Sequence, residues 1–222
     1  MKPKNENEII ESWKLNVAPW IKAIEEKEIT SRVEITNKAI LDTLLSLTPK
    51  RVIDVGCGEG WLVRELVNNG IDATGIDIVP EFIEYAVNKG KGTFKVVAQE
   101  DISEMHFSEK FDTIVCNFSL LGDKAVENVF DKASSILTPG GHLVIQTLHP
   151  INCKDDEHYA DGWQEGSWSG FNDAFSKPAP WYFRTLHTWK KMFCERGFSL
   201  ITYEPINPIT QRAESIIFIG RS

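Results

Sequence analysis

The 222-residue sequence lacks a long apolar stretch, a disulfide-like cysteine pattern and an excess of basic residues. No segment approaches the roughly 18 apolar residues that a membrane-spanning helix requires, so we expect no membrane partner. The four cysteines, Cys57, Cys116, Cys153 and Cys194, form no Cys-x-x-Cys pair, which favours free thiols in a reducing compartment. A net charge of −8 argues against a broad nucleic-acid-binding surface, which needs a basic face.

The sequence also shows no signal for a signal peptide or for a metal site. The first eight residues contain no apolar run that could act as a signal peptide, and we therefore expect a cytoplasmic protein. His149, Cys153 and His158 lie close together in an irregular segment without a fourth obvious ligand, so we expect no metal. With 42% hydrophobic and 25% charged residues, the composition is that of an ordinary soluble globular protein. The pattern does not indicate an oligomeric state.

The most informative segment is residues 51–61, where an apolar strand runs into three glycines and then into a helix. The β-branched residues between 52 and 55 suit a buried strand. Gly56, Gly58 and Gly60 let the backbone turn tightly and approach a ligand, because they carry no Cβ. The helix that follows, over residues 61–69, points its free N–H groups and its positive dipole end at that turn. The segment predicts a binding site for a nucleotide-like ligand.

An acidic residue follows at the spacing that such a site needs. A second apolar strand over residues 71–76 ends in Asp77, nineteen residues beyond Gly58. A carboxylate at this place can accept hydrogen bonds from ribose hydroxyls. The third glycine, however, comes two residues after the second, where the dinucleotide fingerprint has three residues. This spacing speaks against a nicotinamide dinucleotide.

Strand-like and helix-like segments alternate from residue 71 to residue 148, which predicts βαβ units around a mostly parallel sheet. We expect helices over residues 81–88 and 123–137, and strands over 94–98, 111–117 and 142–148, the last after a turn at 138–141. A final helix over 186–196 is followed by strands over 198–203 and 215–220. We expect a single domain, residues 1–222, in which 51–148 form the ligand-binding core and 185–222 the C-terminal helix and strands.

Two regions lie outside this repeat. Residues 5–47 read as two helices, the first carrying Trp13 and Trp20 and the second opening at Thr30 and Ser31, and we expect residues 1–48 to form a helical cap. Residues 149–184 form an insertion whose irregular part, 149–180, is rich in aromatic residues, glycine and proline. A loop of this length in a compact domain is often a lid. Its aromatic side chains fit either a cage over a substrate or the core of the lid itself.

Four motifs follow one another along the chain: residues 54–60 (Asp-Val-Gly-Cys-Gly-Glu-Gly), residues 75–77 (Gly-Ile-Asp), the Phe-Asp pair at 111–112, and residues 137–144 at the entry to the fifth strand. With these motifs in this order, the chain resembles a class I S-adenosylmethionine-dependent methyltransferase. The resemblance implies an α/β fold of three layers, Rossmann-like, with a seven-stranded sheet in the order 3-2-1-4-5-7-6 and strand 7 antiparallel. The helical cap and the insertion after the fifth strand would be additions to that fold.

The resemblance also implies S-adenosylmethionine as the cofactor and assigns residues to its parts. Gly56, Cys57 and Gly58 would line its methionine part, Asp54 would organise the glycine loop through hydrogen bonds, and Asn117 would lie beside the sulfonium.

The adenosyl part would fall to residues after the second and third strands. Asp77 would bind the ribose hydroxyls, and Ile78 would pack against the adenine. Gln99, Glu100 and Asp101 would hydrogen-bond the adenine edge, although this segment departs from the commoner Gly-Asp-Ala pattern.

Arg32 and His149 complete the expected site. The N-terminal part is similar to a subset of these enzymes whose leading helices close over the cofactor, and there Arg32 could pair with the cofactor carboxylate; a plain surface arginine is the alternative.

Methyl transfer requires alignment of a nucleophile with the methyl carbon, and a hydroxyl or a protonated amine must also lose a proton. His149 follows the fifth strand at the carboxyl edge, where ligands of open α/β sheets bind, and is the candidate catalytic base. A hydrogen-bonded structural histidine is the alternative there.

The sequence therefore predicts an enzyme, a methyltransferase that moves a methyl group to an O, N or C nucleophile of a small molecule. The acidic composition disfavours a nucleic-acid substrate, and the aromatic insertion suits an enclosed pocket. Two alternatives remain: a nicotinamide-dependent oxidoreductase of Rossmann type, and a protein that binds S-adenosylmethionine without catalysis.

Overall fold

The computed structural model describes residues 6–153 and 158–222. The side chains of Glu100 and Glu104 are also outside the description. Residues 1–5 of the expected cap, residues 154–157 of the expected lid, and the expected adenine contact of the Glu100 side chain therefore lie outside the described part of the chain.

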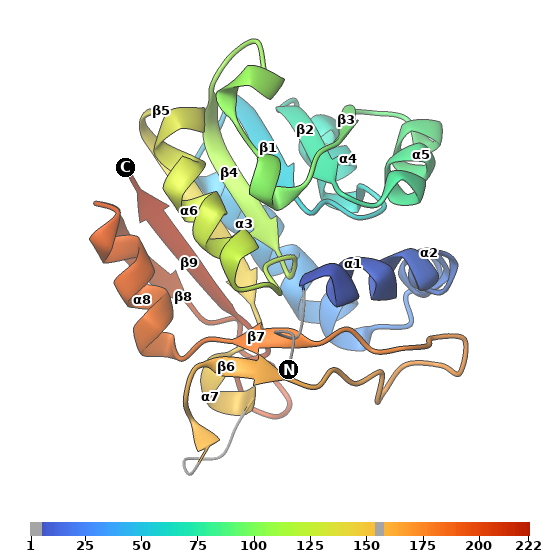
Figure 1. Ribbon diagram of the computed structural model, residues 1–222. Helices are drawn as coiled ribbons and strands as arrows, with labels where there is room; N and C mark the ends of the chain where they lie inside the picture. The colour runs from blue at the N-terminus through green and yellow to red at the C-terminus, as the bar shows by residue number, and fades with distance from the viewer. Residues whose placement is uncertain (1–5, 154–157) are drawn as a thin grey trace.

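A seven-stranded sheet in the order β3-β2-β1-β4-β5-β9-β8 forms the centre of the molecule (Figure 1). β9 is antiparallel to both of its neighbours, and the other pairs are parallel. The predicted order, with an antiparallel last strand, is confirmed. The strands are β1 (Arg51–Val55), β2 (Asp72–Asp77), β3 (Thr93–Val96), β4 (Phe111–Asn117), β5 (Leu137–Thr147), β8 (Ser199–Tyr203) and β9 (Ile216–Arg221).

Helices cover both faces of the sheet, and the alternation of side chains along the strands explains why. Val52 and Val115 are fully buried in a cluster with α3 (Asn37–Ser46) and α4 (Trp61–Asn68), and α5 (Pro80–Lys89) adds to the same side. Their neighbours Ile53 and Ile114 point the other way, into a cluster with α6 (Lys124–Ile136) and α8 (Leu186–Glu195). Figure 1 shows α6 and α8 in front of the sheet and α3 behind it. The expected three layers are present.

The expected helix carrying both Trp13 and Trp20 is wrong, because the structure has two helices, α1 (Glu6–Leu15) and α2 (Val17–Glu25), with a break at Asn16. Proline has no N–H and is tolerated only in the first turn of a helix, so Pro19 requires a new helix to begin just before it. The Asn16 side chain donates to the carbonyl of Ser12 at 2.8 Å and stabilises the break.

The second N-terminal helix opens at Thr30, as predicted, but it begins with a π-helical turn, η1 (Arg32–Thr36), before α3. The backbone N–H of Asn37 donates to the carbonyl of Arg32, five residues back. Such π-turns are rare and often lie at functional sites.

The fifth strand and the insertion after it also differ from expectation. β5 begins at Leu137 rather than His142, because Leu137 pairs with Phe111 before the register shifts, and the expected turn at 138–141 lies within the strand. The insertion, expected to be irregular, contains α7 (Pro150–Cys153) and an antiparallel pair, β6 (Gly162–Gln164) and β7 (Trp181–Phe183). The 3-10 turns η2 (Gln99–Asp101) and η3 (Glu104–His106) follow β3.

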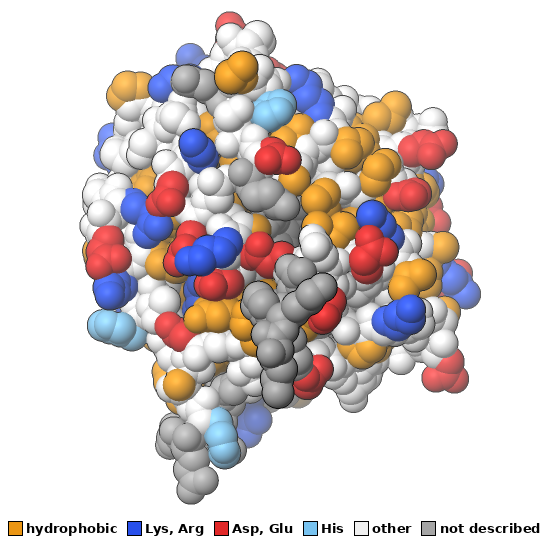
Figure 2. Space-filling model, viewed as in Figure 1, with side chains coloured by type: hydrophobic (Ala, Val, Ile, Leu, Met, Phe, Trp, Pro, Cys, Tyr) orange, Lys and Arg blue, Asp and Glu red, His pale blue; other side chains and the backbone are white. Residues whose placement is uncertain are grey.

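The cap and the insertion lie at one edge of the sheet. In Figure 1, α1 and α2 lie beside the carboxyl ends of the central strands, and the chain between β6 and β7 runs past them. On the face shown in Figure 2, acidic and basic side chains are interspersed, and the described part of this face carries no continuous basic area. Among the helices of residues 6–153 and 158–222, none is long and apolar enough to span a membrane.

Candidate active site

A cavity of about 460 Å³ lies at the carboxyl ends of the parallel strands, where open α/β sheets bind ligands. Its floor comes from the chain that follows β1, β2, β4 and β5, and its walls come from α1, α2, η1 and the insertion. Nine of the twelve expected site residues line this cavity: Arg32, Asp54, Gly56, Cys57, Gly58, Asp77, Ile78, Gln99 and Asn117.

The turn after β1 leaves no room for side chains at two of its glycines. Gly56 has φ +77°, and a Cβ built there would lie 2.4 Å from the Cβ of Ser119. Gly60 has φ +84°, and its Cβ would lie 2.7 Å from the ring of Phe94. The N–H groups of Gly56 and Cys57 both donate to the carbonyl of Ile76, at 2.8 and 2.9 Å. The glycines are therefore required for the close packing of this turn against the loop after β4 and against β3.

Asp77 fixes the same turn from the end of β2. One carboxylate oxygen accepts the N–H of Gly58 at 2.9 Å, and the other accepts the N–H of Val79 at 2.9 Å. Burial raises the pKa of Asp77, and hydrogen bonds from the backbone of Val79, Gly58 and Ile78 oppose this effect. The carboxylate is thereby held in one orientation at the cavity surface.

Asp54 does not have the role expected from its position. It is 2% exposed, its Oδ1 is buried without a hydrogen-bond partner, and within the described part of the chain no group donates to its side chain. Asp77, rather than Asp54, organises the loop. Burial, and then the charges of Glu59 and Asp77, raise the pKa of Asp54 to about 8, while Arg32 opposes them. An unsatisfied carboxyl beside a cavity is a costly arrangement that a ligand donor would relieve.

Glu59 is a cavity residue that the sequence analysis missed. Its side chain is 2% exposed and accepts the N–H of Trp61 at 3.0 Å and a guanidinium N–H of Arg64 at 3.3 Å. Burial raises the pKa of Glu59, and Arg32 and Arg64 oppose this effect. The available signal was an acidic residue immediately before a helix, where the helix dipole favours negative charge.

Arg32 lines the cavity from η1, on the same face of the π-turn as Thr36. Its guanidinium lies over the rings of Trp20 and Trp61, with its central carbon 5.2 and 5.7 Å from the ring centroids, and its Nε donates to Asn37 at 3.4 Å. No carboxylate among the described residues forms an ion pair with it. Burial lowers the pKa of Arg32, and the negative charges of Glu59 and Asp54 oppose this effect. The interpretation of Arg32 as a plain surface residue is wrong.

The remaining expected cofactor contacts divide between the cavity and the surface. Ile78 lines the cavity, and Gln99 does so while donating to the carbonyl of Ser119 at 3.0 Å. Asn117 lines it with a buried Oδ1 that has no hydrogen-bond partner. Asp101 is exposed and lies outside the cavity lining, so the expected adenine contact by Asp101 is not supported.

His149 is not placed for the expected role as a base. Its chain neighbours Leu148 and Pro150 line the cavity, but His149 does not. The ring is 6% exposed, and its Nε2 lies 3.4 Å from a carboxylate oxygen of Glu204. The cause is the direction of the chain as it leaves β5, which turns this side chain toward the segment after β8. A structural role next to Glu204 fits this position better than proton transfer in the cavity.

The aromatic residues of the insertion pack against one another, and several of them also line the cavity. Trp168 and Phe171 contact each other with ring centroids 5.3 Å apart, and they also line the cavity. They meet the cap as well, because Trp168 lies 5.7 Å from Trp13 and Phe171 lies 6.4 Å from Trp20. The insertion and the cap therefore form one aromatic cover over the cavity.

Polar contacts join this cover. The Asn16 side chain donates to the carbonyl of Ser176 at 2.7 Å and accepts the N–H of Ser176 at 2.9 Å. Ser12 donates to the carbonyl of Lys177 at 2.6 Å. Since Asn16 is fully buried, its double contact with Ser176 specifies how the insertion lies on the cap.

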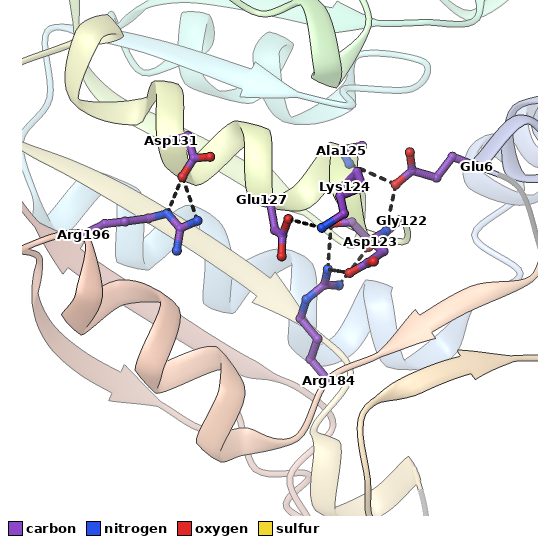
Figure 3. Close-up of polar contacts among 9 residues, drawn as sticks. All are labelled: Glu6, Gly122, Asp123, Lys124, Ala125, Glu127, Asp131, Arg184 and Arg196. Atoms are coloured by element: carbon purple, nitrogen blue, oxygen red, sulfur yellow. Dashed lines mark hydrogen bonds and ion pairs between the residues drawn. The ribbon is translucent and has the colours of Figure 1, made fainter. Parts of the chain in front are cut away.

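The start of α6 is held from two sides, as Figure 3 shows. A Glu6 carboxylate oxygen accepts the N–H groups of Asp123 and Ala125 at 2.8 and 2.9 Å, which places a negative charge at the positive end of the helix. From the other side, Arg184 donates to the carbonyls of Gly122 and Asp123 at 2.8 and 2.9 Å. The cap and the insertion are thus both fixed to the loop that follows β4.

The metal-site candidates do not come together among residues 6–153 and 158–222, where no group of three or more His, Cys, Asp or Glu side chains could hold an ion. The Cys153 thiol instead donates to the carbonyl of His149 at 3.3 Å.

Comparison with known proteins decides which family this geometry represents. A family model described as a methyltransferase domain matches residues 31–203, which include η1, the glycine turn, Asp77 and the insertion. The chain belongs to the methyltransferase domain family. This family differs from the one that the oxidoreductase interpretation requires, in agreement with the glycine spacing.

The chain has curated relatives that match about half of its length. It is 34% identical over 110 residues to a ubiquinone biosynthesis O-methyltransferase of Xylella fastidiosa, an alignment that covers 47% of this chain and 44% of the relative. It is 31% identical over 118 residues to a malonyl-[acyl-carrier protein] O-methyltransferase of Hahella chejuensis, covering 50% of this chain and 42% of the relative. The chain thus spans less than half the length of these curated relatives.

Solved structures of methyltransferases share the fold. An S-adenosylmethionine-dependent methyltransferase from Clostridium acetobutylicum matches with a TM-score of 0.68 at 14% identity, over 91% of this chain and 98% of that protein. One from Mesorhizobium loti matches with a TM-score of 0.63 at 20% identity, over 82% and 96%. These matches confirm the Rossmann-like methyltransferase fold.

Proposed function

We propose that this protein is an enzyme that transfers a methyl group from S-adenosylmethionine to an O, N or C nucleophile of a small molecule. The family supports the reaction class, and the relatives named above are O-methyltransferases. The cavity of about 460 Å³ under an aromatic cover supports a small acceptor over a nucleic acid or a membrane component. We also propose that the protein acts in the cytoplasm.

One observation carries the proposal: Arg32 and Asp54 line the same cavity, where the guanidinium has no ion-pair partner and the Asp54 Oδ1 has no hydrogen-bond partner among the described residues. An amino acid group carries an ammonium and a carboxylate, and it would satisfy both residues. Asp77, oriented by two backbone N–H groups, would accept hydrogen bonds from ribose hydroxyls. The residues present therefore fit S-adenosylmethionine.

The same groups do not fit a nicotinamide dinucleotide. A pyrophosphate would lie over the glycine turn and the start of α4. There the carboxyl groups of Asp54 and Glu59, both 2% exposed, would be close to it. A pyrophosphate would further disfavour the ionised form of these carboxyls, which burial already disfavours, whereas the positive sulfonium and ammonium of S-adenosylmethionine would favour it.

When bound, S-adenosylmethionine supplies an activated methyl group, so the chain itself needs only to bind, orient and exclude water. Arg32 and Asp54 would hold the amino acid end, Asp77 the ribose, and Ile78 and Gln99 the adenine. Asn117 would lie beside the reacting centre, and the aromatic cover would exclude water from it.

The test is thermal unfolding with S-adenosylmethionine, S-adenosylhomocysteine or NAD⁺ at about 100 times the expected dissociation constant, where a ligand stabilises by about 2.7 kcal/mol. We expect stabilisation by both adenosyl compounds and none by NAD⁺. The reverse pattern would refute the proposal. Formation of S-adenosylhomocysteine from S-adenosylmethionine in the presence of an acceptor then separates an enzyme from a protein that only binds.

A further inference from the structure

The cavity has a second half that the proposed cofactor contacts do not use. Asp54 near the end of β1, Asp77 at the end of β2 and Gln99 after β3 define the cofactor half. The other half is formed by the chain after β4 and β5, the chain before β9, and the base of the insertion near β7. If the proposed function holds, this second half receives the methyl acceptor.

The walls of the acceptor half are apolar. Leu120 and Leu121 come from the loop after β4, Pro150 from the start of α7, and Trp181 and Phe183 from β7. The hydrogen bond from the N–H of Tyr182 to the carbonyl of Leu121, at 2.8 Å, holds β7 against that loop. An acceptor that fits these walls is largely apolar.

Arg184 is the cation of this half, and its guanidinium already donates hydrogen bonds to protein groups. It is 3% exposed, and it donates to the carbonyls of Gly122 and Asp123 and to the Asp123 carboxylate at 3.2 Å. Its guanidinium carbon also lies 4.7 Å from the centroid of the Tyr182 ring. An anionic acceptor would have to compete with these contacts, so the structure disfavours a carboxylate or phosphate at this end.

Glu214 is a charged residue of this half that has a carboxylate oxygen free for a ligand. It immediately precedes the buried Ser215 and β9, and its half-buried side chain lines the cavity. Because β9 is antiparallel to β5, its start pairs with the end of β5, Ile216 with Thr147, at the edge where ligands bind. One oxygen of Glu214 accepts from the Asn207 amide at 2.6 Å. The other oxygen accepts no hydrogen bond from a described residue.

Hydrogen bonds within the segment before β9 fix the Asn207 side chain, and Asn207 in turn orients Glu214. The Asn207 side-chain oxygen accepts the N–H groups of Ile209 and Thr210 at 2.9 and 3.1 Å, which leaves its NH₂ group to point at Glu214. The backbone N–H of Asn207 donates to the carbonyl of Arg212 at 2.8 Å. A carboxylate held in this way by a neighbour is preorganised for a contact with a ligand.

We infer that Glu214 binds the reacting end of the acceptor and that this end is an amine on an apolar molecule. A carboxylate among apolar walls gains more from an ammonium than from a neutral hydroxyl, because charge-assisted hydrogen bonds are the stronger ones. The ammonium gives one proton to Glu214, the freed lone pair forms the new N–C bond, and the electrons of the broken S–C bond stay on sulfur. Glu214 then releases the proton to water.

The test uses three probes with one aromatic body and different ends: 2-phenylethylamine, 2-phenylethanol and phenylacetate. Calorimetric titration of each into the protein saturated with S-adenosylhomocysteine confines the probes to the acceptor half. We expect the amine to bind at least about tenfold more tightly than the alcohol, and phenylacetate to bind most weakly.

Two variants identify the residue responsible. Glu214→Gln should remove the preference for the amine while keeping the affinity for S-adenosylhomocysteine, which also shows that the variant is folded. The control Glu84→Gln changes an exposed residue on α5, outside the cavity lining, and should leave all affinities unchanged. Equal or absent binding of amine and alcohol, or an amine preference that survives in Glu214→Gln, would overturn the inference. Failure of S-adenosylhomocysteine itself to bind would instead refute the proposed function.

Discussion

The carboxylate of Asp77 accepts a hydrogen bond from the N–H of Gly58 at 2.9 Å, and so joins the end of β2 to the glycine turn after β1. Its other oxygen accepts the N–H of Val79 at 2.9 Å. The residue that would bind the ribose therefore also sets the shape of the turn that would receive the methionine part. Binding of the ribose and binding of the methionine part would therefore both depend on the Asp77 side chain.

Replacement of this carboxylate should affect ligand affinity more than stability. In Asp77→Asn the amide can accept only one of the two backbone N–H groups, and its NH₂ would face the other. We expect the affinity for S-adenosylhomocysteine to fall by about 2–3 kcal/mol, the range for a lost hydrogen bond to a charged group. Calorimetric titration measures this loss. Asp72→Asn, at the exposed start of β2 where Asp72 pairs with Arg51 at 2.9 Å, is the matched control and should bind normally.

The raised pKa of Asp54 predicts a pH-dependent stability. Its pKa is about 8 in the folded protein against an ordinary 3.8, so the folded state holds one more proton than the unfolded state between these pH values. The contribution of Asp54 to stability therefore decreases as the pH rises through this window.

The variant Asp54→Asn removes this titration. We expect it to be more stable than the wild type above about pH 8, by an amount on the order of a few kcal/mol, and similar to it near pH 4. Urea denaturation across the pH range, without ligand, measures the difference. Parallel pH profiles of the two proteins would contradict the burial of an unpaired carboxyl. The variant should also bind S-adenosylhomocysteine less tightly, because the ammonium loses its partner.

Two glycine substitutions separate backbone strain from steric conflict. Gly56 and Gly70 have similar φ angles, +77° and +81°, but a Cβ at Gly56 would lie 2.4 Å from Ser119, whereas a Cβ at Gly70 would meet nothing within 4 Å. Gly70→Ala should cost about 1 kcal/mol through its left-handed conformation alone. Gly56→Ala should cost at least about 2 kcal/mol more and reduce ligand affinity. Denaturation midpoints that were equal for the two variants would show that the turn is loosely packed.

The contact of Asn16 with Ser176 should control how firmly the insertion is closed. Asn16→Ala leaves the N–H and C=O of Ser176 without these partners, at a cost of about 2–3 kcal/mol for opening of the insertion. Hydrogen exchange in residues 166–180 should accelerate by one to two orders of magnitude, while exchange in β4 and β5 stays slow. Asn88→Ala, at an exposed site on α5, should leave exchange unchanged. Uniform acceleration across the sheet would indicate a general loss of stability instead.

The sheet was predictable because its signals are local. The β-branched run before Gly56 and the spacing from Gly58 to Asp77 depend on short-range preferences of the chain, and they placed β1, the turn and β2 correctly. The strand order came from resemblance to a family rather than from the residues themselves. The predicted strand boundary was wrong where strand pairing prevailed over a turn signal. Leu137 pairs with Phe111 of β4, and β5 therefore begins earlier than predicted.

The parts of the site that sequence reasoning missed depend on contacts between distant residues. Asn16 and Ser176 are 160 positions apart, and no local pattern pairs them. His149 was placed at the correct edge, but its direction is set by the chain after β5, which turns it toward Glu204. Glu214 had a usable signal, since the residue before an antiparallel strand lies at the same edge as the ends of the parallel strands.

The most direct test of the account is a crystal structure of the protein with S-adenosylhomocysteine. We expect electron density above residues 56–58, with both ribose hydroxyls within hydrogen-bond distance of Asp77 and the amino acid group between Arg32 and Asp54. Density for the ligand elsewhere, or a ribose that does not contact Asp77, would contradict the assignment of this cavity to methyl transfer.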